Sequence, residues 1–214
     1  MSAMPRARPF GSGLPQPAFS AASLSTLANR GCFSGKDPYQ FRLSLLEKQP
    51  RFANVLKLAA EKAGWGKPLP KGRARGIALM EGYETYMAQV AEVSVENRQV
   101  KVHRVVVAVD LGRMVNPNIV EQQIESNIVF GLTALLYGDI TLKEGRVQQT
   151  NFNTFQLLRM PETPKIEMHI VKSTEKPGGI GEPSMALLPP AVANAVYALN
   201  GQRLRTMPFR LGLA

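Results

Sequence analysis

The strongest constraint on the fold is a long stretch of alternating apolar and polar residues. It covers residues 75–112 and reads RGIALMEGYETYMAQVAEVSVENRQVKVHRVVVAVDLG. An alternation of period two is typical of a half-buried strand, and the polar residues 96–98 interrupt it as a turn would. The stretch predicts a long antiparallel hairpin. One face should be buried and include Val90 and Val93, whereas successive valines near Val107 indicate burial on both faces there.

Helical segments are predicted where apolar residues recur every three or four positions. Asp37 can cap the first segment, Pro38 suits its first turn, and Pro50 should end it. The third segment opens near Pro117 and carries Ile119 on its apolar side. The four predicted helices cover residues 37–49, 51–63, 117–137 and about 186–200.

Shorter extended segments complete the pattern. Glu144 and Gly145 form a two-residue turn of the type that hairpins favour. Residues 164–173 predict a strand, and residues 203–211 predict a last strand or an extended tail. Hairpins and separated helices in this order predict an α+β fold of antiparallel hairpins packed with helices, rather than a doubly wound parallel sheet.

Charge and residue counts exclude several classes of function. The net charge of +10 is spread along the chain, and only residues 71–75, KGRAR, resemble a basic patch, so no nucleic-acid partner is expected. A basic binding module using residues 67–75 is the weakest alternative. The single cysteine, Cys32, excludes an internal disulfide and a cysteine-built metal site. His103 and His169 lie far apart in the sequence, so no metal-ligating side chains are assigned.

A glycine run, KPGGIGEP at residues 176–183, precedes the last predicted helix. Without side chains at Gly178, Gly179 and Gly181, backbone N–H groups can approach a ligand closely, and the helix N-terminus adds donors suited to an anion. Glu182 repels an anion, but it is useful as a base if it must take a proton from a bound group. A purely structural role stays open, because a strand-to-helix connection needs glycine and a glutamate stabilises the first helical turn.

A series of segments in order carries a resemblance to a known family. These segments are KDPYQFRLSLL, LAAEKAGW, RGIAL, AQVAEVSV, VHRVVVAVDLGRMVNPNIVEQQIE, IVFGLTALLYGDITLKEGRV, NFNTFQLLRMPETPKIEMHIV and GGIGEPSMALLPPAVANAVYALNG. From about Lys36 to its end, the chain resembles the C-terminal part of the large, molybdopterin-binding subunit of the xanthine dehydrogenase and aldehyde oxidoreductase family. The similarity is greatest to the beta subunit of the isoquinoline 1-oxidoreductase type.

The resemblance implies a molybdenum hydroxylase reaction on an N-heteroaromatic or aldehyde substrate, with oxygen from water. It implies that Glu182 is the catalytic base and that Gly178, Gly179, Ile180 and Gly181 lie beside the molybdenum-molybdopterin cofactor. Iron–sulfur clusters would sit on a separate small subunit, which acts as a partner.

A second motif of the family falls on the third predicted helix. Gln123 matches a family Q-x-E-G-G motif and is predicted to be a cofactor-side residue, with a structural amide as the alternative. Ser126 and Asn127 stand where the family has small glycines, and Phe130 stands where some relatives have glutamine.

The resemblance begins abruptly, and the family's earlier cofactor-binding loops have no counterpart in this sequence. We expect residues 1–35 to be a disordered or out-of-frame segment, and residues 36–214 to be the C-terminal part of a molybdopterin-binding domain. Two functions stay open: an active-site portion that needs the missing part of the large subunit, or a non-catalytic remnant that associates with other subunits. The sequence shows no export signal or membrane span, and the resemblance allows a cytoplasmic or periplasmic location.

Overall fold

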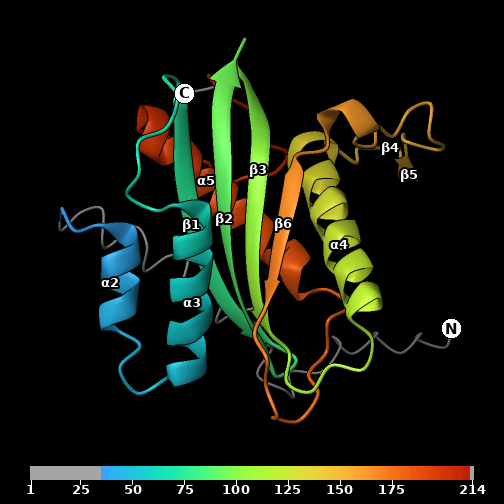
Figure 1. Cartoon of the computed structure of the whole chain (residues 1–214). Coiled ribbons are helices and arrows are strands. Elements are labelled where there is room, and N and C mark those ends of the chain that lie inside the picture. The colour runs from blue at the N-terminus through green and yellow to red at the C-terminus, as the bar shows by residue number, and fades with distance from the viewer. Residues whose placement is uncertain (1–34, 213–214) are drawn as a thin grey trace, which may run out of the picture.

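The computed structural model describes residues 35–212, so the prediction for residues 1–34 lies outside the described residues. A four-stranded sheet in the order β1-β2-β3-β6 forms the centre of the fold (Figure 1). Its strands are β1 (Arg73–Gly82), β2 (Thr85–Glu96), β3 (Gln99–Asp110) and β6 (Lys165–Ile170). The α+β prediction is confirmed.

The predicted hairpin is part of a larger meander. β2 and β3 pair antiparallel around a turn at Asn97 and Arg98, as predicted, but β1 also pairs antiparallel with β2. The turn between β1 and β2 lies at Tyr83 and Glu84, with φ values of 57° and 64°. Since neither residue is a glycine, the two turn positions carry none of the residues that usually mark such a turn. The sheet is not wholly antiparallel either, because β6 pairs parallel with Arg104–Val109 of β3.

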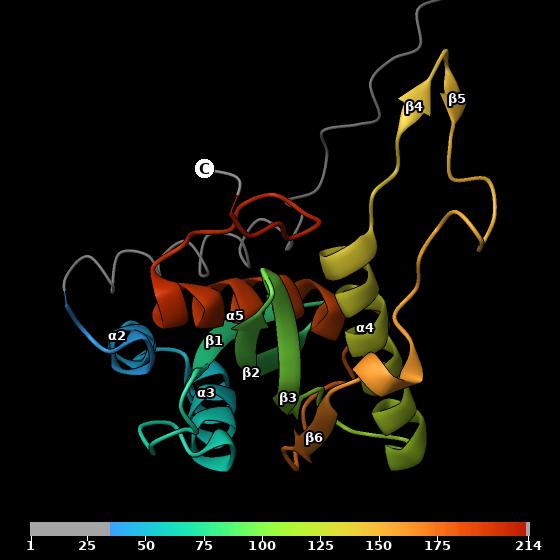
Figure 2. The ribbon, with the colours of Figure 1, turned by 90° about the horizontal axis from the view of Figure 1, so that it is seen from above.

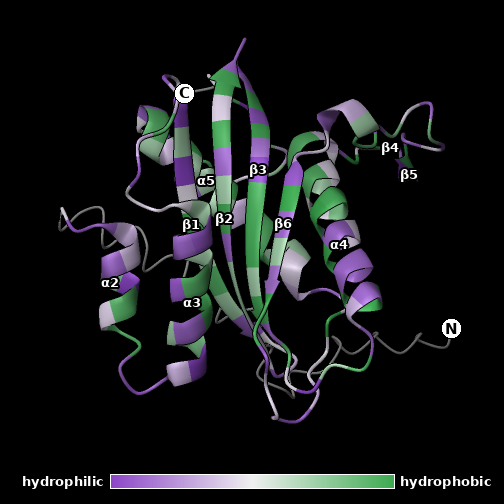
Figure 3. Ribbon diagram, in the orientation of Figure 1, coloured by the Kyte–Doolittle hydropathy of each residue, from purple (hydrophilic) through white to green (hydrophobic). Residues whose placement is uncertain are grey.

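Both faces of the sheet are covered, so burial on both faces near Val107 is confirmed, whereas the prediction of a single buried face for the rest of the hairpin was wrong. Val93 belongs to a core with helices α4 (Pro117–Tyr137) and α5 (Pro183–Asn200), whereas Val90 belongs to a second core with α3 (Pro50–Ala63). Figures 1 and 2 show α5 across one face and α3 across the other, with α4 beside β6. β2 and the second half of β3 are accordingly buried along most of their length, and the second half of β3 is mostly hydrophobic (Figure 3).

The predicted helices form, with three corrections. The first helix ends at Ser44, five residues before its predicted end. Asp37 caps the short helix α2 (Pro38–Ser44) by accepting hydrogen bonds from two backbone amides. Ile119 is 56% exposed rather than buried, because the buried side of α4 runs through Ile124, Ile128, Leu132 and Leu135. The last helix begins at Pro183, about one turn earlier than predicted, because proline suits the first helical position.

The turn at Glu144 and Gly145 joins the two shortest strands, β4 (Leu142–Lys143) and β5 (Arg146–Val147). Figure 2 shows this hairpin standing away from the rest of the fold. We call residues 139–160 the arm. A 3₁₀ turn, η1 (Met160–Glu162), begins at the last residue of the arm and leads toward β6. Residues 203–211 contain no strand, and bends at residues 206–208 interrupt the predicted extended tail. None of the helices in residues 35–212 is long and apolar enough to cross a membrane.

Candidate functional site

The glycine run lies in a connection from β6 to α5, residues 172–182, which we call the glycine loop. Its backbone is bonded to two other segments. Gly178 donates to the carbonyl of Leu111 at 2.7 Å, and Gly179 donates to the carbonyl of Tyr83 at 2.8 Å. In return, the Glu175 carbonyl accepts a bond of 2.9 Å from the amide of Arg113. The loop is therefore fixed against the β1–β2 turn and the segment after β3.

Close packing explains two of the three glycines of the motif. A Cβ on Gly178 would collide with the Thr85 hydroxyl, and a Cβ on Gly179 would lie 2.8 Å from the Cβ of Tyr83. Gly181 differs, because a Cβ there would meet no atom within 4 Å. Gly178 and Gly179 thus allow the loop to pack on the β1–β2 turn, and Gly181 faces open space.

Helix α4 holds the end of the loop through two side-chain amides. Gln123 Nε2 donates to the Gly181 carbonyl at 2.8 Å, and Asn127 Nδ2 donates to the Ile180 carbonyl at 3.3 Å. The two side chains are four residues apart and so share one face of the helix. In a trans peptide the following N–H points opposite to the carbonyl, so the amides of Gly181 and Glu182 are directed away from α4.

These contacts change the interpretation of the Gln123 motif. The structure gives Gln123 the role of loop support, and its predicted contact with a cofactor stays a prediction. Asn127, which the sequence presented only as a departure from the family motif, is buried and supports the same loop. The four-residue spacing between Gln123 and Asn127 was the one pattern in the sequence that could have indicated that both support the same loop.

Glu182 is the N-cap residue of α5, but its side chain makes no capping hydrogen bond. The side chain is exposed, and its Oε2 accepts a hydrogen bond of 3.3 Å from the Tyr83 hydroxyl. The carboxylate is thus not used to satisfy the helix amides. It stands beside the open space at Gly181, where it could accept a proton from a bound group.

A charge pair fixes the segment on which the loop rests. Arg51 binds both carboxylate oxygens of Asp110 at 2.8 Å, and Asp110 also accepts a hydrogen bond from the amide of Gly112. The bonds from Arg51 hold the pKa of Asp110 below its ordinary value, although burial opposes them. A Cβ on Gly112 would collide with the Lys176 carbonyl, so this segment and the loop are in direct contact.

Three buried polar atoms near the loop have no hydrogen-bond partner: Thr85 Oγ1, Gln89 Oε1 and Ser184 Oγ. Thr85 is next to Gly178, and Gln89 Nε2 donates to the Ser184 carbonyl at 2.7 Å. Sequence reasoning did not find this group, because its members come from β2 and α5. These three atoms leave hydrogen-bonding positions unused beneath the loop.

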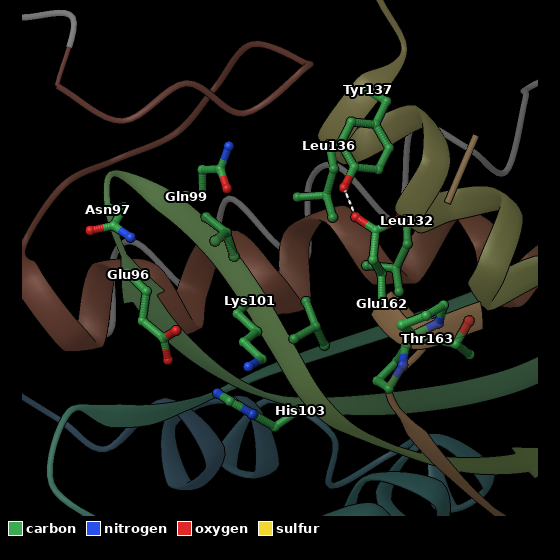
Figure 4. Close-up of a pocket in the computed structure, with 14 residues that line it drawn as sticks. Glu96, Asn97, Gln99, Lys101, His103, Leu132, Leu136, Tyr137, Glu162 and Thr163 are labelled. Atoms are coloured by element: carbon green, nitrogen blue, oxygen red, sulfur yellow. Dashed lines mark hydrogen bonds between the residues drawn. The ribbon is translucent and has the colours of Figure 1, made fainter. Parts of the chain in front are cut away.

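A pocket lies elsewhere, between the β2–β3 turn and the C-terminal end of α4 (Figure 4). It measures about 510 Å³, and Glu182 does not line it. Tyr137 donates a hydrogen bond to Glu162 across it. Burial of the Tyr137 hydroxyl, and to a lesser degree its hydrogen bond to Glu162, raises the pKa of Tyr137 to about 12. Within the described residues, no three His, Cys, Asp or Glu side chains gather closely enough to hold a metal ion.

Comparison with known proteins gives a consistent set of relatives. The molybdopterin cofactor-binding domain family matches residues 44–164, a segment that ends before the glycine loop. The chain is 36% identical over 196 residues to the membrane-bound aldehyde dehydrogenase [pyrroloquinoline-quinone] of Gluconacetobacter polyoxogenes. This match covers 82% of this chain and 25% of that protein. It is 33% identical over 183 residues to isoquinoline 1-oxidoreductase subunit beta of Brevundimonas diminuta, which covers 83% of this chain and 23% of that protein.

Solved structures agree at the level of fold. Quinoline 2-oxidoreductase from Pseudomonas putida 86 matches with a TM-score of 0.53 and 23% identity, over 58% of this chain and 17% of that one. The chain spans about a quarter or less of the length of the curated relatives it matches.

Proposed function

We propose, from the premise that this chain belongs to the molybdopterin cofactor-binding domain family, that residues 36–214 supply the glutamate loop of a molybdenum hydroxylase, with Glu182 as the catalytic base. The observation that carries the proposal is an exposed carboxylate that does not cap its helix, on a loop fixed by bonds from the β1–β2 turn, the segment after β3 and α4. Substrates would be N-heteroaromatic rings or aldehydes, with oxygen from water. Two relatives carry names of this kind, an isoquinoline oxidoreductase subunit and an aldehyde dehydrogenase.

The residues at the loop fit a bound cofactor. Gly181 leaves space for a neighbouring group, and the amides of Gly181 and Glu182 are directed away from α4. These amides and the backbone of Ile180 would contact the cofactor, Gly178 and Gly179 would shape the wall, and Gln123 would lie at the same side. When bound, the molybdenum-molybdopterin cofactor would supply the two-electron oxidation, and electrons would leave through iron–sulfur clusters on a small partner subunit.

The chain's own residues would handle the proton. Tyr83 donates to Oε2 of Glu182, which orients the carboxylate and leaves Oε1 able to accept a proton. The partial positive charge at the N-terminus of α5 stabilises negative charge beside it. The bonds from Gln123 and Asn127 would keep the loop in one geometry, which proton transfer over hydrogen-bond distance requires.

The test is Glu182→Gln in the assembled enzyme that contains this chain. Removal of a general base lowers kcat by about 10²- to 10⁴-fold, and the molybdenum content should stay unchanged. Glu175→Gln is the matched control, because Glu175 is exposed on the same loop and contributes only its backbone carbonyl to the contact with Arg113. Wild-type turnover by the Glu182→Gln enzyme would remove Glu182 from the role of base.

One observation favours a second candidate, a module that associates with other subunits without catalysis. The arm exposes several large apolar side chains. The intact mass of the protein in its native host separates the two candidates, together with its molybdenum content. A short product that binds another subunit but retains no molybdenum would support association alone. Stoichiometric molybdenum would support the catalytic role.

A further inference from the structure

The arm exposes six large apolar side chains. Phe152 is 76% exposed, Leu142 is 71% exposed and Met160 is 87% exposed. Single exposed apolar residues are common on protein surfaces, but a cluster on one projecting segment marks a contact site. The exposed apolar residues of the arm are Ile140, Leu142, Val147, Phe152, Leu157 and Met160.

The arm has little internal structure to hold its shape. Its two strands are two residues long, and a hairpin of this kind is marginal in water by itself. Its contacts with the body lie at the base, where Leu158 donates to Thr133 Oγ1 at 3.1 Å and Asp139 pairs with Arg210 at 2.6 Å. A stable position for the tip therefore requires a contact outside residues 35–212.

The apolar exposure continues from the base of the arm onto α4. Phe130 is 66% exposed and lies one helical turn before Thr133, the residue that holds Leu158. On the other side of the base lies the pocket of Figure 4, which Leu132 and Leu136 line together with residues 99–103 of β3. This part of β3 precedes Arg104–Val109, the segment paired with β6, so its outer edge has no strand beside it in the described residues.

We propose that the arm and Phe130 form the docking surface for the rest of the large subunit, the polypeptide that the curated relatives carry beyond the portion this chain matches. The matched segment is about a quarter of these relatives, so they carry a polypeptide large enough to cover the arm beyond it. The proposal depends on membership of the family and not on the role of Glu182.

Charge favours this occupant over a second copy of the chain. The arm and the two residues after it contain Lys143, Arg146 and Arg159 against Asp139, Glu144 and Glu162, so residues 139–162 are neutral. The whole chain carries +10, and two such chains repel each other. A neutral surface also lacks the net positive charge that draws a protein to an anionic membrane. The surface fits an apolar protein face.

A photocrosslinking amino acid at position 152 tests the proposal in the native host, with the full chain expressed. The same amino acid at position 130 tests the α4 part of the surface. Crosslinked peptides should map to molybdopterin-binding sequence outside residues 1–214, on the same polypeptide or on a separate one. Position 45 is the control. Leu45 is an exposed apolar residue at the C-terminal end of α2, which lies away from the arm (Figure 1), so it should give no such crosslink.

Every other result overturns the proposal. Crosslinks to a second copy of the chain, to lipid or to a small iron–sulfur subunit would each assign the surface to a different occupant, and the absence of crosslinks would mean that the surface is free. As a second measurement, Phe130→Ser should lower the crosslinking yield at position 152 by about tenfold, as expected for loss of one buried aromatic contact. Both phenylalanines are exposed, so folding of the chain should not obscure the result.

Discussion

The glycine loop and the arm are both irregular connections, yet they are held in opposite ways. The loop has few large side chains, and its backbone is bonded to Tyr83, Leu111 and two amides of α4. The arm has many large side chains, and the hydrogen bonds of residues 141–154 link these residues to one another. The loop's geometry is thus set within this chain, whereas the position of the arm depends on what covers it.

The difference separates two kinds of functional surface. A site that must hold one carboxylate in place needs contacts from several elements, and the proposed base Glu182 has them. A surface that binds another polypeptide needs exposed apolar area, which the arm provides. Substitutions matched between the two regions test this contrast.

The largest effect should come from glycines with the same backbone conformation. Gly112 and Gly145 both have φ of 75°, but a Cβ on Gly112 would collide with the Lys176 carbonyl, whereas a Cβ on Gly145 would meet nothing. Gly112→Ala should lower the free energy of unfolding by about 4 kcal/mol, and Gly145→Ala by about 1 kcal/mol. Urea denaturation measures both. Equal losses would show that the loop does not press on Gly112.

The next pair compares two aspartate–arginine contacts. Asp110 is 5% exposed beneath the loop, whereas Asp139 is 51% exposed at the base of the arm. Asp110→Asn should cost about 3 kcal/mol, because it leaves Arg51 without its charged partner. Asp139→Asn should change the free energy of unfolding by less than about 0.5 kcal/mol.

The effect of Asp110 should depend on pH in one direction. Its pKa is lower in the folded protein than the ordinary aspartate value, mainly because Arg51 bonds to the carboxylate. The ion pair therefore stabilises fully above the ordinary pKa, and this contribution is lost as the pH falls through the folded pKa. The difference between wild type and Asp110→Asn should be constant above about pH 5 and shrink below about pH 4. A difference that grows toward acid would contradict the assigned partner.

Two side chains of α4 should loosen the two regions separately. Asn127→Ala removes the bond to the Ile180 carbonyl, and Thr133→Val removes the acceptor of the Leu158 amide. Each loss is worth about 1 kcal/mol, or roughly fivefold faster local amide exchange. Hydrogen exchange should quicken in the glycine loop for Asn127→Ala and at the base of the arm for Thr133→Val. If either variant loosened both regions, the two would not be independent.

The sequence predicted local structure well and contacts between distant segments poorly. The alternation of residues 75–112 predicted the β2–β3 hairpin, and Glu144 with Gly145 predicted the arm's turn. The turn at Tyr83 was missed because its residues adopt positive φ without being glycine. The parallel pairing of β6 was missed because no local pattern records which strand becomes a neighbour.

The candidate site divides in the same manner. The glycine run itself could be seen in the sequence, and so could Glu182. That Gly178 and Gly179 are needed for packing against the β1–β2 turn could not, because Thr85 and Tyr83 are about a hundred positions away in the chain. Asn127 was hidden for the same reason.

The smallest effect should come from replacing an exposed apolar residue of the arm, compared here with an apolar residue of the loop. Phe152→Ser on the arm should leave the free energy of unfolding within about 0.5 kcal/mol of wild type, because the ring is exposed and loses no contact. Ile180→Ser in the loop should cost about 1–2 kcal/mol, because Ile180 packs against the core of the sheet and α5. Denaturation of the isolated chain measures both changes. A clear loss for Phe152→Ser would mean that the arm already packs against its own chain, and the surface proposed for the large subunit would then be occupied.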